Sequence, residues 1–283
     1  MLTDAFLARL DALRLTMRGR ARGGAGGTRR SRQTGASAEF SDYREYVPGD
    51  DIRRLDWNAM ARFDRLYMKL YVEEQESQVN LLLDGSASMA AKWPAARAAT
   101  EALGYLALTG GDRLRLGLLK NGTCRDFPVL SGRAAFVDLN AHLDLCVPEG
   151  REGGLTDAIR HAEGLKKGLC FLITDGYTED ALGEALRYLR YLEQETVVVQ
   201  VLSGEELRPE LEGALRLVDS ETGEGMDLLA DRRALEHYHR ALADFLQRIR
   251  KNCSANEAAC LLLDGGENVE ETLIPLLSKC GLI

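Results

Sequence analysis

Two patterns alternate along most of the chain: short, continuous apolar runs and longer segments whose apolar residues recur at helical spacing. The apolar runs cover 79–84, 169–174, 196–202 and 259–263. The helical patterns cover 94–108, 133–145, 155–166, 179–194, 231–252 and 268–279. Buried parallel strands read as continuous apolar runs, and strands separated by helices form a parallel sheet between two helical layers. The pattern therefore predicts an α/β fold with a doubly wound, mostly parallel sheet.

Two hairpins interrupt this alternation. Asn121-Gly122 separates the strand patterns 114–120 and 123–130, and this dipeptide is a strong signal for a tight turn between antiparallel strands. We expect this hairpin to supply one antiparallel edge strand to the main sheet. A second strand pair is expected beyond Leu215, with its turn at Thr222-Gly223.

The first 36 residues form a separate region in the predicted organisation. Leu2, Phe6, Leu10, Leu13 and Met17 form an apolar stripe at helical spacing, which predicts an amphipathic helix. This helix could pack on its own domain or on another protein. The Gly- and Arg-rich segment 18–34 that follows has no periodicity, and it is either a linker or an arm that binds an acidic partner or nucleic acid.

Residues 37–75 are predicted to be a β-rich extension, and 76–283 the main domain. The extension is dense in aromatic and charged residues, and its apolar residues alternate from Leu66 to Val72, as in a half-buried strand. No apolar stretch approaches the ~20 residues that cross a bilayer. The six cysteines form no C-x-x-C pair, which favours a reducing, cytoplasmic location.

Charge is distributed unevenly along the chain. Residues 1–75 hold 14 Lys and Arg against 11 Asp and Glu, whereas the remainder holds 22 against 33. Six of the arginines fall between Arg18 and Arg32. An acidic main domain makes nucleic acid an unlikely general partner, because affinity for phosphate depends on basic surface. Only the arginine-rich arm favours that class of function.

Five oxygen-bearing side chains carry the candidate chemistry: Asp84, Ser86, Ser88, Thr156 and Asp175. The first three follow the apolar run 79–83, Thr156 opens a predicted helix, and Asp175 follows the run 169–173. Ligands of open α/β sheets gather at the carboxyl ends of the strands, so we expect these oxygens to converge. Carboxylates and hydroxyls without thiols or imidazoles suit Mg²⁺, with Mn²⁺ or Ca²⁺ as alternatives.

The alternative is that these Asp and Ser residues only cap the helices that follow them. The metal prediction also requires that no lysine or arginine of the same molecule occupies the carboxylates. A phosphatase that ends its first strand in Asp needs a second carboxylate two residues later, where this chain has Ser86. A metal-dependent hydrolase of phosphoesters is therefore the minor alternative. We predict no catalytic residues.

These motifs resemble a known family. Asp84-x-Ser86-x-Ser88, Thr156 in its Gly-Gly-x-Thr loop and Thr174-Asp175-Gly176 resemble the metal-ion-dependent adhesion site of von Willebrand factor A-like domains. The segment from Glu39 to Trp57, followed by Ala61-Arg62, resembles the signature of the bacterial and archaeal domain-of-unknown-function family number fifty-eight. Met60 departs from it, because a small polar residue is more usual there.

The resemblance implies a function and a partner. Members of this family are commonly encoded beside MoxR-type AAA+ ATPases. The resemblance therefore implies a non-catalytic, metal-dependent adaptor, whose partner ATPase offers an acidic residue to the cation. Many members carry two membrane helices before the signature. This chain shows none there, so no membrane role is expected.

Overall fold

The computed structural model describes most of the chain as two compact units. One unit comprises Met1–Gly24 with Ser77–Ile283, and the other comprises Ala25–Glu76. The described residues are 2–16, 38–47, 55–63, 65–73, 78–149, 154–177, 182–209, 213–218 and 225–283. The arginine-rich segment 18–34 lies outside them, so its predicted role as linker or arm stays a prediction.

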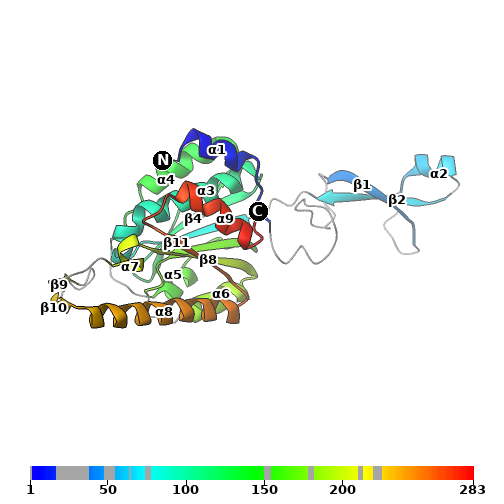
Figure 1. The fold of residues 1–283 in the computed structure, drawn as a ribbon. Coiled ribbons are helices and arrows are strands. Elements are labelled where there is room, and N and C mark those ends of the chain that lie inside the picture. The colour runs from blue at the N-terminus through cyan, green and yellow to red at the C-terminus, as the bar shows by residue number, and fades with distance from the viewer. Residues whose placement is uncertain are drawn as a thin grey trace. The chain divides into compact units, whose positions relative to one another are not determined.

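The larger unit is built on a mostly parallel sheet (Figure 1). Over the described residues this sheet is seven-stranded, with the order β11-β8-β7-β3-β4-β5 and with β6 also paired to β4. Its strands are β3 (Gln78–Asp84), β4 (Arg113–Lys120), β5 (Thr123–Asp126), β6 (Leu130–Ser131), β7 (Gly168–Thr174), β8 (Gln194–Leu202) and β11 (Ala259–Asp264). β5 and β6 run antiparallel to β4, whereas the other pairs are parallel. The predicted fold class and the antiparallel edge are confirmed.

The two central strands place the candidate site. Every position of β3 and β7 is buried, as their continuous apolar sequences predict. The two strands pair in parallel, with Leu83 opposite Ile173. Their carboxyl ends, which carry Asp84 and Thr174, therefore lie side by side at one edge of the sheet.

Helices cover both faces of the sheet, and each face has its own apolar core (Figure 1). On one face lie α1 (Asp4–Asp11), α3 (Trp93–Thr109), α4 (Phe136–Asp144) and α9 (Val269–Lys279). On the other lie α5 (Leu155–Arg160), α6 (Leu182–Tyr191) and α8 (Arg232–Ala255). The strand side chains alternate between these cores, because successive residues of a strand point to opposite faces.

The N-terminal helix packs on its own domain. Phe6 and Leu10 of α1 are fully buried in the core that α3 and α9 share. Thr3 caps the helix and its backbone N–H donates to Glu270 of α9 at 2.7 Å, while the N–H of Thr16 donates to the carbonyl of Leu282 at 2.7 Å. The apolar stripe left open whether this helix packs on its own domain or on another protein. The described contacts are with its own domain.

The smaller unit contains an antiparallel pair and a short helix. β1 (Ala38–Glu45) pairs with β2 (Tyr67–Glu73), which confirms strands in the predicted β-rich extension. Helix α2 (Trp57–Phe63) was not predicted. Asp56 begins it by accepting the backbone N–H groups of Asn58 and Ala59, and the hydroxyl of Tyr43 donates to the same carboxylate at 2.9 Å. The centre of the family signature, residues 48–54, lies outside the described residues.

Several predicted boundaries were wrong. The helix expected at 155–166 ends at Arg160, and Gly164, with a positive φ of 71°, lies in the turn between this helix and β7. The strand expected at 123–130 is divided into β5 and β6. A short 3₁₀ helix (Ala87–Lys92) precedes α3, and a second short helix, α7 (Gly204–Leu207), follows β8. The predicted strand pair is present as β9 (Gly213–Val218) and β10 (Gly225–Ala230).

Candidate metal centre

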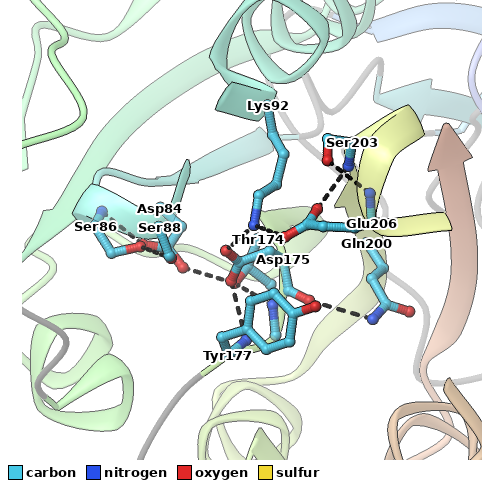
Figure 2. Close-up of polar contacts among 11 residues, drawn as sticks. Asp84, Ser86, Ser88, Lys92, Thr174, Asp175, Tyr177, Gln200, Ser203 and Glu206 are labelled. Atoms are coloured by element: carbon cyan, nitrogen blue, oxygen red, sulfur yellow. Dashed lines mark hydrogen bonds and ion pairs between the residues drawn. The ribbon is translucent and has the colours of Figure 1, made fainter. Parts of the chain in front are cut away.

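The loop after β3 brings the first three predicted oxygens together. Asp84 ends the strand and is only 6% exposed. Its Oδ1 accepts the backbone N–H of Ser86 at 3.0 Å, which turns the loop back on the carboxylate. The hydroxyl oxygens of Ser86 and Ser88 lie 3.0 Å apart and share a hydrogen bond (Figure 2). One carboxylate and two hydroxyls thus form one local cluster.

The end of β7 joins this cluster. The hydroxyl of Thr174 donates to Oδ2 of Asp84 at 2.6 Å and accepts the N–H of Gly176 at 3.0 Å. Asp175 is fully buried, and its Oδ1 accepts the N–H of Tyr177 at 3.0 Å. Gly176 has a φ of 82°, a left-handed conformation that residues with a Cβ atom rarely adopt. The Thr-Asp-Gly motif therefore makes a tight turn that holds Asp175 beside Asp84.

Thr156 has a buried hydroxyl that could still bind a ligand. It lies in the first turn of α5 and is 2% exposed, and among the described residues its hydroxyl has no hydrogen-bond partner. The start of α5 lies against the β4–β5 turn, because the Cβ position of Gly154 is 3.3 Å from the Cα of Gly122. A buried hydroxyl without a partner is costly, so a ligand there would satisfy it.

The electrostatics of the cluster favour a cation. Burial raises the pKa of Asp84, and the neighbouring charge of Asp175 raises it further, while hydrogen bonds from Thr174 and Ser86 act in the opposite direction. Two carboxylates that share a buried site disfavour each other's ionised form. A positive charge between them would remove this conflict.

The structure already places one such charge at the site, and the sequence did not reveal it. Nζ of Lys92 lies 2.8 Å from Oδ2 of Asp175 and 2.8 Å from Oε1 of Glu206 (Figure 2). The Lys92 side chain is 3% exposed. It also lies over the ring of Tyr177, 4.7 Å from the centroid. The condition that no lysine of the same chain occupies a carboxylate is therefore not met at Asp175, and it is met at Asp84 among the described contacts.

No local pattern marks Lys92 or Glu206 as partners of Asp175. Lys92 reads as an ordinary residue before the helix that Trp93-Pro94 opens. Glu206 belongs to a capping box in which it and Ser203 bond each other's backbone N–H groups, a pattern visible in Ser203-x-x-Glu206. Only the tertiary fold brings both side chains to the end of β7.

The donor set is consistent with a hydroxyl-assisted site. Among the residues that the structure describes, no group of three or more His, Cys, Asp and Glu side chains could hold a metal ion. Any cation at Asp84 would therefore depend on hydroxyl oxygens, of which those of Ser86 and Ser88 lie in the same loop. Hard cations such as Mg²⁺ accept such ligands and retain several waters.

The histidines lie elsewhere. His142 stacks on Phe127, with ring centroids 5.0 Å apart, and His161 contacts the backbone oxygens of Gly122 and Asp157. His237 and His239 are exposed on α8. Each therefore has a surface or packing role in the described structure.

Comparison with known families decides what kind of chain this is. Residues 42–247 match the family model described as "Protein of unknown function DUF58". The chain belongs to the DUF58 family. This confirms the family that the signature segment and the three oxygen-bearing motifs predicted, and the match includes most of that signature and all five candidate ligands.

Relatives of this DUF58 chain include the Uncharacterized protein Rv1480 of Mycobacterium tuberculosis (strain ATCC 25618 / H37Rv) and the Uncharacterized protein Mb1516 of Mycobacterium bovis. Each is 27% identical over 251 residues, which cover 83% of this chain and 77% of the relative.

Solved structures that match this chain include the conserved hypothetical protein BatB from Bacteroides thetaiotaomicron, with 15% identity and a TM-score of 0.45. That match covers 72% of this chain and 98% of BatB. The SpRpn10 VWA domain matches at 13% identity and a TM-score of 0.37, over 71% of this chain and 94% of that domain. In the part of the DUF58 chain that the structure describes, no helix has the length and apolar character to span a bilayer.

Proposed function

We propose that this DUF58 protein is a non-catalytic interaction module whose contact with its partner passes through a divalent cation. The observation that carries the proposal is the cluster of Asp84, Ser86 and Ser88 beside a buried Asp175, together with the unpartnered hydroxyl of Thr156. A buried hydroxyl and two buried carboxylates at the carboxyl edge of a parallel sheet are well suited to bind a small, hard cation.

The oxygens around Asp84 suit such a cation, whereas Lys92 occupies the second carboxylate, Asp175. Asp84, Ser86, Ser88 and Thr156 would hold the ion, and Asp175 would be the second carboxylate of the site. The ion would supply a concentrated positive charge with a position left for an acidic side chain of the partner. Asp175 is also the partner of Lys92, at 2.8 Å, so the ion and the ammonium group would both need that carboxylate.

The arrangement offers little for catalysis. The Ser86 and Ser88 hydroxyls bond each other, and among the described contacts neither bonds a histidine or a lysine that could act as a general base. Asp84 and Asp175 are occupied by loop N–H groups, Thr174 and Lys92. A phosphoesterase would need a free acid or base beside the reacting group.

The partner we propose is a MoxR-type AAA+ ATPase, for which the protein would act as an adaptor in assembling or remodelling other complexes. This proposal rests on the family resemblance. It also rests on the open coordination position that a cation held mainly by hydroxyls would offer to an acidic side chain. The cytoplasmic location stays a prediction from cysteine usage, and nucleic acid remains the partner expected only if the arginine-rich arm is functional.

Calorimetric titration of Mg²⁺ and Mn²⁺ into the full chain after EDTA treatment tests the metal. Binding is expected for the wild type and for Asp138→Ala, a control carboxylate in the first turn of α4, and is expected to be lost in Asp84→Ala. Equal heats in wild type and Asp84→Ala would remove the metal from the proposal.

A pull-down tests the partner. A purified MoxR-type ATPase is expected to bind in Mg²⁺, to dissociate in EDTA, and to bind Asp84→Ala poorly under both conditions. Metal-independent capture would contradict a cation-mediated contact. Turnover of a generic phosphoester that disappears in Asp175→Ala would instead favour the hydrolase.

A further inference from the structure

Lys92 is a buried cation at the edge of the candidate metal centre. It ends the 3₁₀ helix Ala87–Lys92, which includes Ser88, and its side chain is 3% exposed. Its Nζ is 2.8 Å from both Asp175 and Glu206 and lies over the face of Tyr177 (Figure 2). A lysine is seldom buried unless its charge is paired, and here two carboxylates and an aromatic ring pair it.

The charges of the cluster do not balance. Asp84, Asp175 and Glu206 are three carboxylates, and Lys92 is the single ammonium group that the described contacts place among them. Lys92 contacts Asp175 and Glu206, and among the described contacts it does not reach Asp84. The cluster has capacity for further positive charge.

We propose that Lys92 competes with the divalent cation for Asp175, and that Glu206 holds the ammonium when the cation takes that carboxylate. This inference rests on the proposed metal function. It makes Lys92 the residue that sets how tightly the site binds its cation, although Lys92 is not itself a ligand.

The hydrogen bonds of Asp175 explain why the two cations compete. Its Oδ1 accepts the N–H of Tyr177, and its Oδ2 accepts Lys92. Because the side chain is fully buried, water cannot screen an ammonium and a divalent ion that contact the same carboxylate. The cation therefore binds Asp175 only as far as Lys92 withdraws from it.

Glu206 is suited to receive the displaced ammonium. Its Oε2 accepts the backbone N–H of Ser203 at 2.7 Å, and its own N–H donates to the Ser203 hydroxyl at 3.1 Å, so the capping box holds its carboxylate in place without Lys92. Its Oε1 already contacts the ammonium. Lys92 can thus move away from Asp175 while it keeps one carboxylate partner and the ring of Tyr177.

Calorimetric titration of Mg²⁺ and Mn²⁺ into the full chain tests this competition. Lys92→Met is expected to bind the cation at least tenfold more tightly than the wild type. Lys92→Gln is a second variant, whose neutral amide can still donate to Asp175 and Glu206 and so guards against misfolding. Circular dichroism checks that each variant is folded, and the shift of the thermal midpoint on adding metal gives an independent readout.

The matched control is Lys120→Met. Lys120 ends β4 at the same edge of the sheet and lies 3.6 Å from Glu149, so its loss changes the overall charge equally without touching Asp175. Its effect on cation affinity is expected to stay within about threefold, because the Lys120 side chain is partly open to solvent, which screens its charge.

A double-mutant cycle tests the role of Glu206. Glu206→Gln is expected to weaken cation binding in the wild type, because Lys92 then has only Asp175, and to have little effect in the Lys92→Met background. Equal effects in both backgrounds would overturn the part of the inference that concerns Glu206.

The outcomes separate this inference from the proposed function. Equal or weaker binding by both Lys92 variants, with binding retained in the wild type, overturns the competition and makes Lys92 a structural ion pair. Cation binding that appears only when Lys92 is replaced supports the competition. If neither the wild type nor the Lys92 variants bind a cation in a manner that Asp84→Ala abolishes, the metal function fails and the inference fails with it.

Discussion

The hydroxyl of Thr174 donates to Oδ2 of Asp84 at 2.6 Å and thereby joins the ends of the two central strands. Both residues are buried, and they lie 90 positions apart in the sequence. The same hydroxyl accepts the N–H of Gly176, so one side chain links the Asp84 loop to the Thr-Asp-Gly turn. The geometry of the candidate metal centre depends on this contact.

Thr174→Val tests that dependence. Valine has nearly the same shape but leaves a buried Asp84 oxygen and the Gly176 N–H without their partner, which costs about 1–3 kcal/mol in the free energy of unfolding. Thr100→Val is the control, because the buried hydroxyl of Thr100 only adds a bond to the helix carbonyl of Ala96 at 2.7 Å. Urea unfolding in EDTA measures both. A smaller loss for Thr174→Val than for Thr100→Val would contradict the linking role.

Lys92→Met should destabilise the protein when no divalent cation is present. The substitution leaves the buried carboxylate of Asp175 without its counter-charge, and breaking a buried pair in this way costs about 3–5 kcal/mol. Lys167→Met removes an exposed pair with Glu193 and should change stability far less, because solvent screens such a pair. Urea unfolding of both variants in EDTA provides the comparison, and similar losses would mean that the Lys92 pair is no stronger than a surface pair.

Gly168 should tolerate no side chain. A Cβ at this position would collide with the backbone carbonyl oxygen of Gln78 on the neighbouring strand, and backbone cannot move aside as a flexible side chain can. We expect Gly168→Ala to cost about 1–3 kcal/mol or more through overpacking between β3 and β7.

Gly183→Ala is the matched control for Gly168→Ala. A Cβ on Gly183 in α6 would meet its nearest neighbour, Asn252, at an ordinary 3.5 Å. Alanine there should be neutral or stabilising by up to about 1 kcal/mol, since glycine is a poor helix former. Thermal unfolding of the two variants should therefore shift in opposite directions or leave only Gly168→Ala destabilised, and equal shifts would contradict the close strand contact.

Asp11 should make the docking of α1 sensitive to acid. The hydroxyl of Tyr105 donates to its Oδ1 at 2.7 Å and Arg133 contacts its Oδ2 at 2.9 Å, and these bonds hold the pKa of Asp11 below its ordinary value of 3.8. A carboxylate with a lowered pKa stabilises the fold above its ordinary pKa, and that contribution is lost as the pH falls through the folded value.

The expected result is a pH-dependent difference between wild type and Asp11→Asn. The wild type should be the more stable at neutral pH, and its advantage should decline only below about pH 4. Unfolding at a series of pH values measures this, with Asp138→Asn as control. A stability difference between the two proteins that stays constant from neutral pH down to well below 3.8 would show that Asp11 acts through hydrogen bonds that do not require its negative charge.

Much of this architecture follows from the sequence alone. The continuous apolar runs at β3, β7 and β8 can be satisfied only by strands covered on both faces, and the Asn121-Gly122 turn requires an antiparallel neighbour for β4. Parallel strands end at a common edge, so the approach of Asp84 to Asp175 also followed from the pattern. These features depend on local periodicity, which the amino-acid order records directly.

Other features were decided only by the tertiary structure. The pairing of Lys92 with Asp175 and Glu206 joins residues that are far apart in the sequence, and no periodicity marks such a contact. The docking of α1 was equally open, because an apolar stripe shows that a helix must be covered but not by what. Charge pairing and packing between distant elements depend on which side chains the completed fold places within a few ångströms, and that information appears only when the chain is folded.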